Sequence, residues 1–220
     1  MKSKTTLCLL ALLIGLTGCV TEKLPPVSLY TLDPDLDAIK APVVGENKTG
    51  KILMLGRISS TQPFNGPEML YSDAQLKQNS YAYSRWSSPA TVMLLSIFEE
   101  AIEKSGQYRA VVPYSSQARS DLLLEGTLFD FSHHIKKNGS SEGVVKISFK
   151  LIDSKTRKVM ASRMFVSSVP ASEANAPAAA MALNQAVTNV IRELLDWLKK
   201  QSKDQSRINQ GVRVLEINFS

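Results

Sequence analysis

The feature that most constrains this chain is a cysteine, Cys19, that comes directly after an apolar N-terminal run. Lys2 and Lys4 make the start of the chain basic, and an apolar stretch follows over residues 7–16. That stretch is shorter than the roughly 20 apolar residues with which a helix spans a bilayer. The pattern is typical of a secretory signal peptide, in which small residues precede the cleavage site. We therefore predict that residues 1–18 are removed and take no part in the fold.

The residues around the predicted cleavage site match a lipidation motif. Leu16, Thr17, Gly18 and Cys19 fit the bacterial lipobox, Leu-[Ala/Ser/Thr]-Gly-Cys. In proteins with this motif the cysteine thiol receives a diacylglyceryl group, cleavage falls before the cysteine, and the new amine is acylated. The alternative is a chance cysteine after an ordinary signal peptide. We expect cleavage between Gly18 and Cys19 and lipid attachment at Cys19, where several acyl chains together anchor a protein stably.

The cysteine count supports lipid attachment and bounds the fold. The chain has two cysteines, and Cys8 lies in the apolar run that leaves with the signal peptide. Cys19 alone remains, so the mature chain forms no internal disulfide although its destination is oxidising. The mature chain must therefore be stabilised by a hydrophobic core, for which its length is sufficient.

The residues after Cys19 predict where the body of the protein lies. Position 20 is Val, whereas an Asp there is the usual signal for retention at the inner membrane. We therefore expect a lipid anchor in the outer membrane with the body facing the periplasm. Residues 19–26 read as a lipidated tether that ends in two prolines. Residues 27–202 read as a single domain.

Composition excludes one class of partner. Removing residues 1–18 takes away Lys2 and Lys4, which lowers the formal net charge from +6 to +4. This mild excess is not concentrated in a basic stripe with interleaved aromatic residues, as a nucleic-acid-binding surface would require. We expect no nucleic-acid partner.

Hydrophobic periodicity predicts an α+β domain. Its sheet is expected to be mixed but mostly antiparallel, with two main amphipathic helices packed on one face. One helix begins near Pro89 and stops near Gly106, and the other covers residues 172–200. The strands are expected at residues 27–32, 51–58, 68–71, 79–83, 108–112, 122–131, 144–153 and 159–168.

The last residues, 203–220, form a tail after a polar break. Residues 212–219 alternate between apolar and polar as a strand does. Three interpretations stay open, namely a final edge strand, a segment that docks a partner, and a disordered end.

We find no arrangement of residues that predicts catalysis, metal binding or a cofactor, and we expect a non-catalytic protein. His133 and His134 are the only histidines. Neighbouring side chains on a strand point to opposite faces, so the two cannot bind one ion from the same side. We interpret them as a solvated strand end that leads into a hairpin.

One aromatic segment is a candidate contact site. Tyr81, Tyr83 and Trp86 lie close together beside Arg85, and these residue types are enriched at binding hot spots. Two interpretations stay open, and one is that the four residues contact a partner. The alternative is that Trp86 and one tyrosine belong to the helix–sheet core.

Three motifs together resemble a known family. They read YTLDP at residues 30–34, YAYSRWSSP at 81–89 and SGQYRAVVP at 105–113. With the lipobox, this series resembles the ABC-type transport auxiliary lipoproteins, the family that includes the PqiC lipoproteins. The resemblance covers about residues 23–201. The tail after Lys203 and a long connection over residues 59–79 depart from the family pattern.

The resemblance implies a role in lipid transport. Family members act beside ABC transporters or MCE-domain proteins that move lipids between the two membranes of the envelope. It implies a non-catalytic outer-membrane lipoprotein that docks a periplasmic MCE-domain or ABC transporter component, and a homo-oligomer is one form that such a docking element takes. Two alternatives remain open. One is an envelope-assembly lipoprotein, such as a cell-wall synthase activator or a secretion-channel subunit, and the other is a lipoprotein that carries lipid in a cavity of its own.

Overall fold

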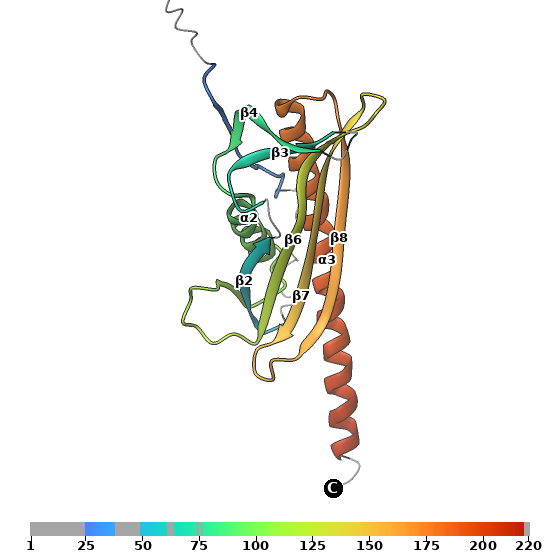
Figure 1. Ribbon diagram of the computed structural model, residues 1–220. Helices are drawn as coiled ribbons and strands as arrows, with labels where there is room; N and C mark the ends of the chain where they lie inside the picture. Colours follow the sequence, from blue (N-terminus) through green and yellow to red (C-terminus); the bar gives the residue numbers. More distant parts are fainter. Residues whose placement is uncertain (1–24, 38–48, 61–63, 74, 76, 218–220) are drawn as a thin grey trace, which may run out of the picture.

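The computed structural model describes residues 25–37, 49–60, 64–73, 75 and 77–217, with side chains as far as Lys203 (Figure 1). The predicted signal peptide, the lipobox with Cys19, and the tether as far as Leu24 lie outside the described residues. Among the helices in the described ranges, none combines the length and the apolar character needed to cross a bilayer.

The described chain forms eight strands and two helices, and the α+β class is confirmed. The strands and helices expected between residues 27 and 200 are all present, with shifted ends. In chain order they are β1 (Ser28–Tyr30), β2 (Ile52–Ser60), β3 (Glu68–Ser72), β4 (Gln78–Trp86), α2 (Ala90–Lys104), β5 (Ala110–Pro113), β6 (Leu122–Ile135), β7 (Ser141–Asp153), β8 (Val159–Ala171) and α3 (Ala176–Ile217).

The sheet is mixed, and it is less antiparallel than expected. Its strand order is β1-β4-β3-β6-β2-β5, and β7 and β8 continue from the other edge of β6. Among the described strands, β3–β4, β6–β7 and β7–β8 are antiparallel, whereas β1–β4, β2–β5, β2–β6 and β3–β6 are parallel. Parallel pairing needs a long crossover connection. Helix α2 lies in the connection that returns the chain to β5 beside β2, and hydrophobic alternation alone does not reveal such a return.

We distinguish two parts of the sheet, the hairpin half and the corner. The hairpin half consists of the long strands β6, β7 and β8, which follow one another in the chain and are covered by α3. The corner consists of the short strands β1, β3 and β4, which meet the end of β6. In Figure 1 the corner lies at the upper end of the molecule, and the turn between β7 and β8 lies at the lower end.

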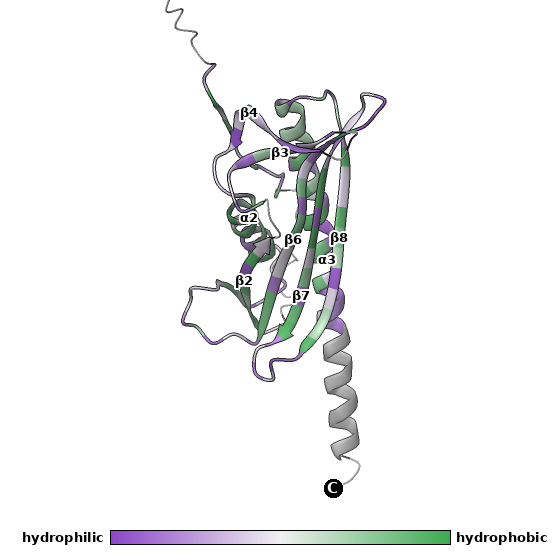
Figure 2. Ribbon diagram, viewed as in Figure 1, coloured by the Kyte–Doolittle hydropathy of each residue, from purple (hydrophilic) through white to green (hydrophobic). Residues whose placement is uncertain are grey.

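A chain of aromatic contacts connects both helices to the hairpin half. Phe98 of α2 lies edge-on to Phe149 of β7, with ring centroids 5.1 Å apart. Phe149 is 6.0 Å from Phe165 of β8, which is 5.9 Å from Trp197 of α3. Figure 2 shows polar and apolar residues in turn along these long strands. The apolar residues of one face of the hairpin half are thus buried against helices, as period-2 alternation predicts.

Helix α3 comes unusually close to the backbone of β7 at Gly143. A Cβ atom added there would lie 2.7 Å from the backbone nitrogen of Leu183, closer than real contacts allow. Small residues on the buried face of α3, such as Ala179 and Ala186, keep this side of the helix narrow. The helix begins at Ala176, where the Asn175 side chain accepts a hydrogen bond from the Ala178 backbone N–H at 2.9 Å, as a helix cap does.

Of the three interpretations of the tail, the final edge strand is wrong for the residues that the structure describes, which are helical as far as Ile217. Helix α3 continues to Ile217 and extends past the lower end of the sheet (Figure 1). Ile208, Val212 and Leu215 fit a helical spacing as well as a strand pattern, so the sequence allowed both. Elongating a helix that has already formed avoids the unfavourable nucleation step.

Candidate functional site

The predicted contact residues lie on β4, and the structure divides them between the core and the surface. Trp86 is only 2% exposed and belongs to the hydrophobic core, where its ring lies 5.2 Å from that of Phe131. Tyr81 is half-buried, whereas Tyr83 is 44% exposed and Arg85 is also exposed. Of the two interpretations, a surface contact by Trp86 is therefore wrong, because its side chain is buried in the core.

The position of Trp86 follows from how β1 and β4 pair. The parallel register places Tyr30 beside Trp86 and Leu29 beside Arg85. The Trp86 backbone N–H donates to the carbonyl of Pro67 at 2.8 Å, and the Ser87 N–H donates to the carbonyl of Tyr30 at 2.7 Å. Tyr30 packs against the core on the same side as Trp86. The core alternative, with Trp86 and one tyrosine inside, describes the molecule.

Tyr81 is the tyrosine that turns inward, and it contacts His133. The Tyr81 hydroxyl and His133 Nδ1 are 2.7 Å apart and share a hydrogen bond. The Tyr81 and Tyr71 rings are 4.8 Å apart. Burial, together with the neighbouring Tyr71, raises the pKa of Tyr81 to about 12, so its hydroxyl stays protonated at physiological pH.

The solvated strand end expected at the two histidines is wrong for His133, which is fully buried. Pairing of Tyr71 with His133 extends the sheet beyond the end of β2, and the Tyr81 ring stacks on His133 with ring centroids 6.3 Å apart. Burial, and then the neighbouring His134, lower the pKa of His133 below its ordinary value. Among the described residues, its Nε2 atom is buried and finds no hydrogen-bond partner.

His134 points to the opposite side and bonds Asp130 and Ser132. Its Nε2 lies 2.9 Å from Asp130 Oδ2 and 3.1 Å from Ser132 Oγ, and the Ser132 hydroxyl donates to Asp130 Oδ1 at 2.5 Å. A Ser–His–Asp relay needs the serine and the carboxylate on different ring nitrogens. Here both contact one nitrogen, so the cluster lacks that geometry. The hydrogen bond to Asp130 is the main reason that the pKa of His134 is raised.

The exposed side of β1 is a feature that sequence reasoning left undecided. Val27 is 50% exposed and Leu29 is 70% exposed, whereas Tyr30 and Leu32 turn inward. The alternation predicts two different faces, but it does not say which one is buried. Val27 and Leu29 therefore join Tyr83 and Arg85 as surface residues at the corner.

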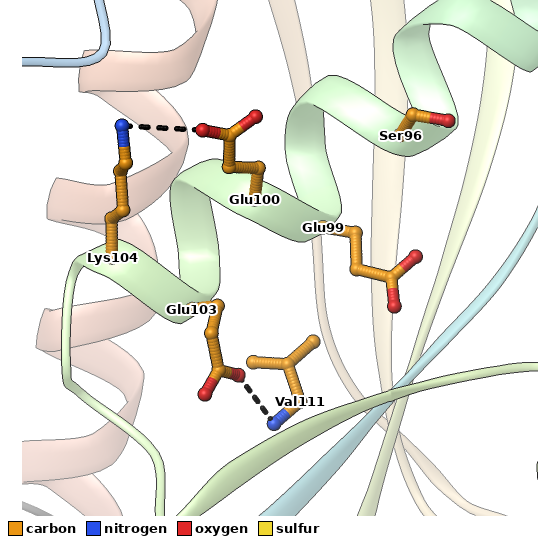
Figure 3. Close-up of a pocket in the computed structure, with 6 residues that line it drawn as sticks. All are labelled: Ser96, Glu99, Glu100, Glu103, Lys104 and Val111. Carbon is orange, nitrogen blue, oxygen red and sulfur yellow. Dashed lines mark hydrogen bonds and ion pairs between the residues drawn. The ribbon is translucent and has the colours of Figure 1, made fainter.

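A surface pocket lies along α2, away from the corner (Figure 3). Glu103 Oε2 accepts a hydrogen bond from the Val111 backbone N–H at 2.9 Å, which holds β5 against the helix. Lys104 Nζ is 3.2 Å from Glu100 and 3.4 Å from Asp37, and these two carboxylates raise the pKa of Lys104. The lining residues are Ser96, Glu99, Glu100, Glu103, Lys104 and Val111.

Four of the residues that line this pocket take part in structural interactions, namely Glu100, Glu103, Lys104 and Val111. In the part of the chain that the structure describes, no group of three or more His, Cys, Asp or Glu side chains is arranged to hold a metal ion. The described residues thus combine a well-packed α+β body, an exposed apolar and aromatic corner, and a carboxylate-lined surface pocket.

The chain belongs to the family of ABC-type transport auxiliary lipoprotein components. The family model matches residues 30–194, which include nearly all of the described sheet, α2 and the packed part of α3. The three motifs at residues 30–34, 81–89 and 105–113 lie inside this range, and the resemblance drawn from them is confirmed.

Solved structures share the fold. Protein XCC0632 from Xanthomonas campestris superposes with a TM-score of 0.73 at 24% identity, over 82% of this chain and 99% of that one. A second structure, of an uncharacterized protein, has a TM-score of 0.60 at 15% identity, over 79% of this chain and 99% of that one. A comparison with curated protein sequences finds no match. At these identities the structures show the fold alone.

Proposed function

We propose that this protein is a non-catalytic lipoprotein of the outer membrane that serves an ABC or MCE-type system for lipid transport between the two membranes. In this proposal Cys19 carries the diacylglyceryl and N-acyl groups, and the body docks a periplasmic MCE-domain protein or ABC transporter component. The observation that carries the proposal is the family match over residues 30–194 in a chain that also has a lipobox. Several anchored copies acting together as a homo-oligomer are part of the same proposal.

The dimensions of the chain fit a docking role. Val27 lies eight positions after Cys19, so the body starts within about 28 Å of the anchor even if the tether is fully extended. Helix α3 has 42 residues, which corresponds to about 63 Å. Its C-terminal end lies at the opposite end of the molecule from the corner, where the described chain begins (Figure 1). A partner that docks at the C-terminal end of α3 would therefore lie well away from the anchor.

The lipid-carrier alternative gains no support from the pocket that the structure describes. It lies open at the surface with three glutamates among its lining residues, whereas a site that carries a ligand buries most of the ligand's surface. Among the largest fully buried side chains, Phe98, Phe149 and Phe165 are instead packed against one another.

Crosslinking in the native envelope tests the partner. The full-length tagged chain is crosslinked in cells, captured, and its partners are identified by mass spectrometry. We expect an MCE-domain protein or an ABC transporter component to be enriched. Enrichment of a peptidoglycan synthase would instead support the envelope-assembly alternative and overturn this proposal.

Two cysteine variants test the anchor. We expect Cys19→Ser to remove the acyl mass from the N-terminal peptide and to deplete the protein from the outer-membrane fraction. Cys8→Ser is the matched control, because Cys8 belongs to the predicted signal peptide and its loss should change neither result. Unchanged outer-membrane attachment of Cys19→Ser would show that the anchor lies elsewhere.

A further inference from the structure

We propose that the exposed side of the corner is a second membrane contact, which rests on the phospholipid headgroups of the bilayer that holds the anchor. We call this surface the corner face and define it by Val27, Leu29, Tyr83 and Arg85. The proposed function enters only by placing a bilayer near the tether. The corner face itself is a property of the folded body.

Strand pairing gathers these four residues. Leu29 of β1 lies directly beside Arg85 of β4 in the parallel register, and continuing that register by one residue brings Val27 opposite Tyr83. All four are exposed, with Leu29 at 70%. Their neighbours Tyr30 and Trp86 point into the core, so the backbone beneath the corner face is held in place.

The chemistry of the corner face suits a bilayer interface. Transfer of a leucine or valine side chain from water to the boundary between headgroups and acyl chains lowers the free energy. Tyrosine is amphipathic and is enriched at the level of the headgroups. Arg85 forms no ion pair with any residue in the described ranges, so its guanidinium remains available to a lipid phosphate.

The tether decides which surface reaches the membrane. Val27 follows Cys19 by only eight residues, which limits the corner face to about 28 Å from the acylated cysteine. The opposite end of the sheet is farther away, because β6 runs eleven residues, or about 36 Å, from Leu122 to His133 beside the corner. The corner face is thus an exposed apolar surface close to the anchor.

A second copy of the chain is a less suitable occupant. Stable protein interfaces bury about 800 Å² on each partner and involve roughly 20 to 30 residues a side. The corner face has four side chains, and β1 itself has only three residues. This surface is too small for a stable interface between two copies. A bilayer needs no matching surface, because it deforms around whatever side chains enter it.

Vesicle flotation tests the proposal without the anchor. The mature chain, residues 19–220 with Cys19→Ser, is mixed with vesicles of phosphatidylethanolamine and a minority of phosphatidylglycerol. We expect measurable partitioning, and we expect Leu29→Gln to lower the partition coefficient about fivefold to tenfold. Arg85→Gln should weaken binding at low salt only, since screening removes its attraction to anionic lipid at high salt.

Val159→Gln is the matched control. Val159 is 57% exposed and begins β8, and its pairing with Ile152 places it at the end of the sheet away from the corner. We expect it to partition as the parent does. Equal loss in Val159→Gln and Leu29→Gln, or no flotation of the parent chain, would overturn the proposal. Both positions are exposed, so an unchanged melting temperature verifies that the variants fold.

A second experiment uses the acylated chain in vesicles of the same composition. A photoreactive benzoylphenylalanine replaces Leu29 in one sample and Val159 in another. We expect lipid adducts at position 29 and none at position 159. Adducts from position 29 to another copy of the chain, without lipid adducts, would assign the corner face to self-association and overturn the proposal. Flotation does not depend on acylation or on a transport partner, so its failure is distinct from failure of the proposed function.

Discussion

The hairpin half and the corner are built from the sequence in different ways. The three strands of the hairpin half have 13 or 14 residues each, follow one another directly and pair antiparallel. The strands of the corner have three to nine residues, and β1 pairs in parallel with β4, which lies far along the chain. Local contacts therefore organise the hairpin half, whereas the corner depends on contacts between distant segments.

The difference extends to what the two parts bury. One face of the hairpin half is covered along its length by helices, so its inward positions are almost fully enclosed. The corner encloses Trp86 and most of Tyr81, but it leaves Tyr83 exposed two residues from Tyr81 and leaves Leu29 exposed beside Arg85. Stability should therefore reside mainly in the hairpin half, and the corner should tolerate change on its outer side.

The largest expected effect is in the hairpin half. Phe149→Ala removes the ring that connects Phe98 of α2 to Phe165 of β8, and we expect it to lower the free energy of unfolding by about 3–5 kcal/mol. Urea denaturation followed by circular dichroism measures this loss. Phe129→Ala, on the same half but 39% exposed, is the control and should change stability by about 1 kcal/mol or less. Similar losses in both variants would contradict the unequal burial of the two sides.

The same contrast explains which parts of the fold the sequence predicts. Residues 144–153 alternate so regularly that the strand, its face and its antiparallel neighbours follow from the pattern. In the corner the strands were predicted, but their partners were not. The parallel pairs of β1 with β4 and β3 with β6 join segments whose sequences contain no local signal of each other.

The candidate site was predicted in part for a related reason. Strict alternation would place Tyr81, Tyr83 and Arg85 on one face of β4. The β3–β4 register shifts between Glu68 and Leu70, so β4 holds extra residues there and the faces are no longer continuous. Tyr81 is thereby directed toward His133 while Tyr83 stays exposed. Such a register shift has no reliable signal in the local sequence, because it depends on how the residues of the neighbouring strand pair with β4.

The close approach of α3 to β7 allows a sharper test of the hairpin half. Gly143→Ala would place a Cβ 2.7 Å from the backbone nitrogen of Leu183, so the helix must shift. We expect a loss of about 1–3 kcal/mol, as overpacked cores show. Thermal and urea unfolding measure it.

Ser168→Ala is the control for this substitution. Ser168 is exposed and pairs with Val144, the neighbour of Gly143. We expect it to change stability by about 0.5 kcal/mol or less. If Gly143→Ala is equally mild, α3 is free to move away from β7, and the hairpin half is looser than its packing indicates.

Two tyrosines test whether the faces of the corner differ. Tyr81→Phe removes the hydroxyl that bonds His133 and should lower the free energy of unfolding by about 1 kcal/mol. Tyr83→Phe makes the same chemical change two residues later on an exposed side chain, and should have an effect within about 0.5 kcal/mol. Urea unfolding of both variants gives the comparison. Equal effects would mean that the corner does not separate an inner from an outer tyrosine.

The smallest expected effect concerns the two histidines where the hairpin half meets the corner. His134 bonds Asp130 and has a raised pKa, whereas buried His133 has a lowered pKa, both relative to the ordinary value of 6.5. We expect proton NMR titration of the two imidazole rings to show midpoints on opposite sides of that value. Two coincident midpoints would contradict the difference in their surroundings.

The directions of the two histidine pKa shifts predict how the stability of the fold depends on pH. Because the folded pKa of His134 is raised, its stabilising contribution is fully present below pH 6.5 and is lost as the pH rises through the folded pKa. Asp130→Asn keeps an oxygen that can accept the Ser132 hydroxyl but removes the charge beside His134. It should lower stability by about 0.5 kcal/mol at acidic pH, a modest value because the pair is partly exposed, and by less at pH well above 7.

Buried His133 acts in the opposite sense, since the unfolded chain gains a proton below pH 6.5 that the folded chain does not bind. The difference between parent and Asp130→Asn isolates His134, because His133 contributes to both, and a difference that does not change with pH would rule out the charged pair.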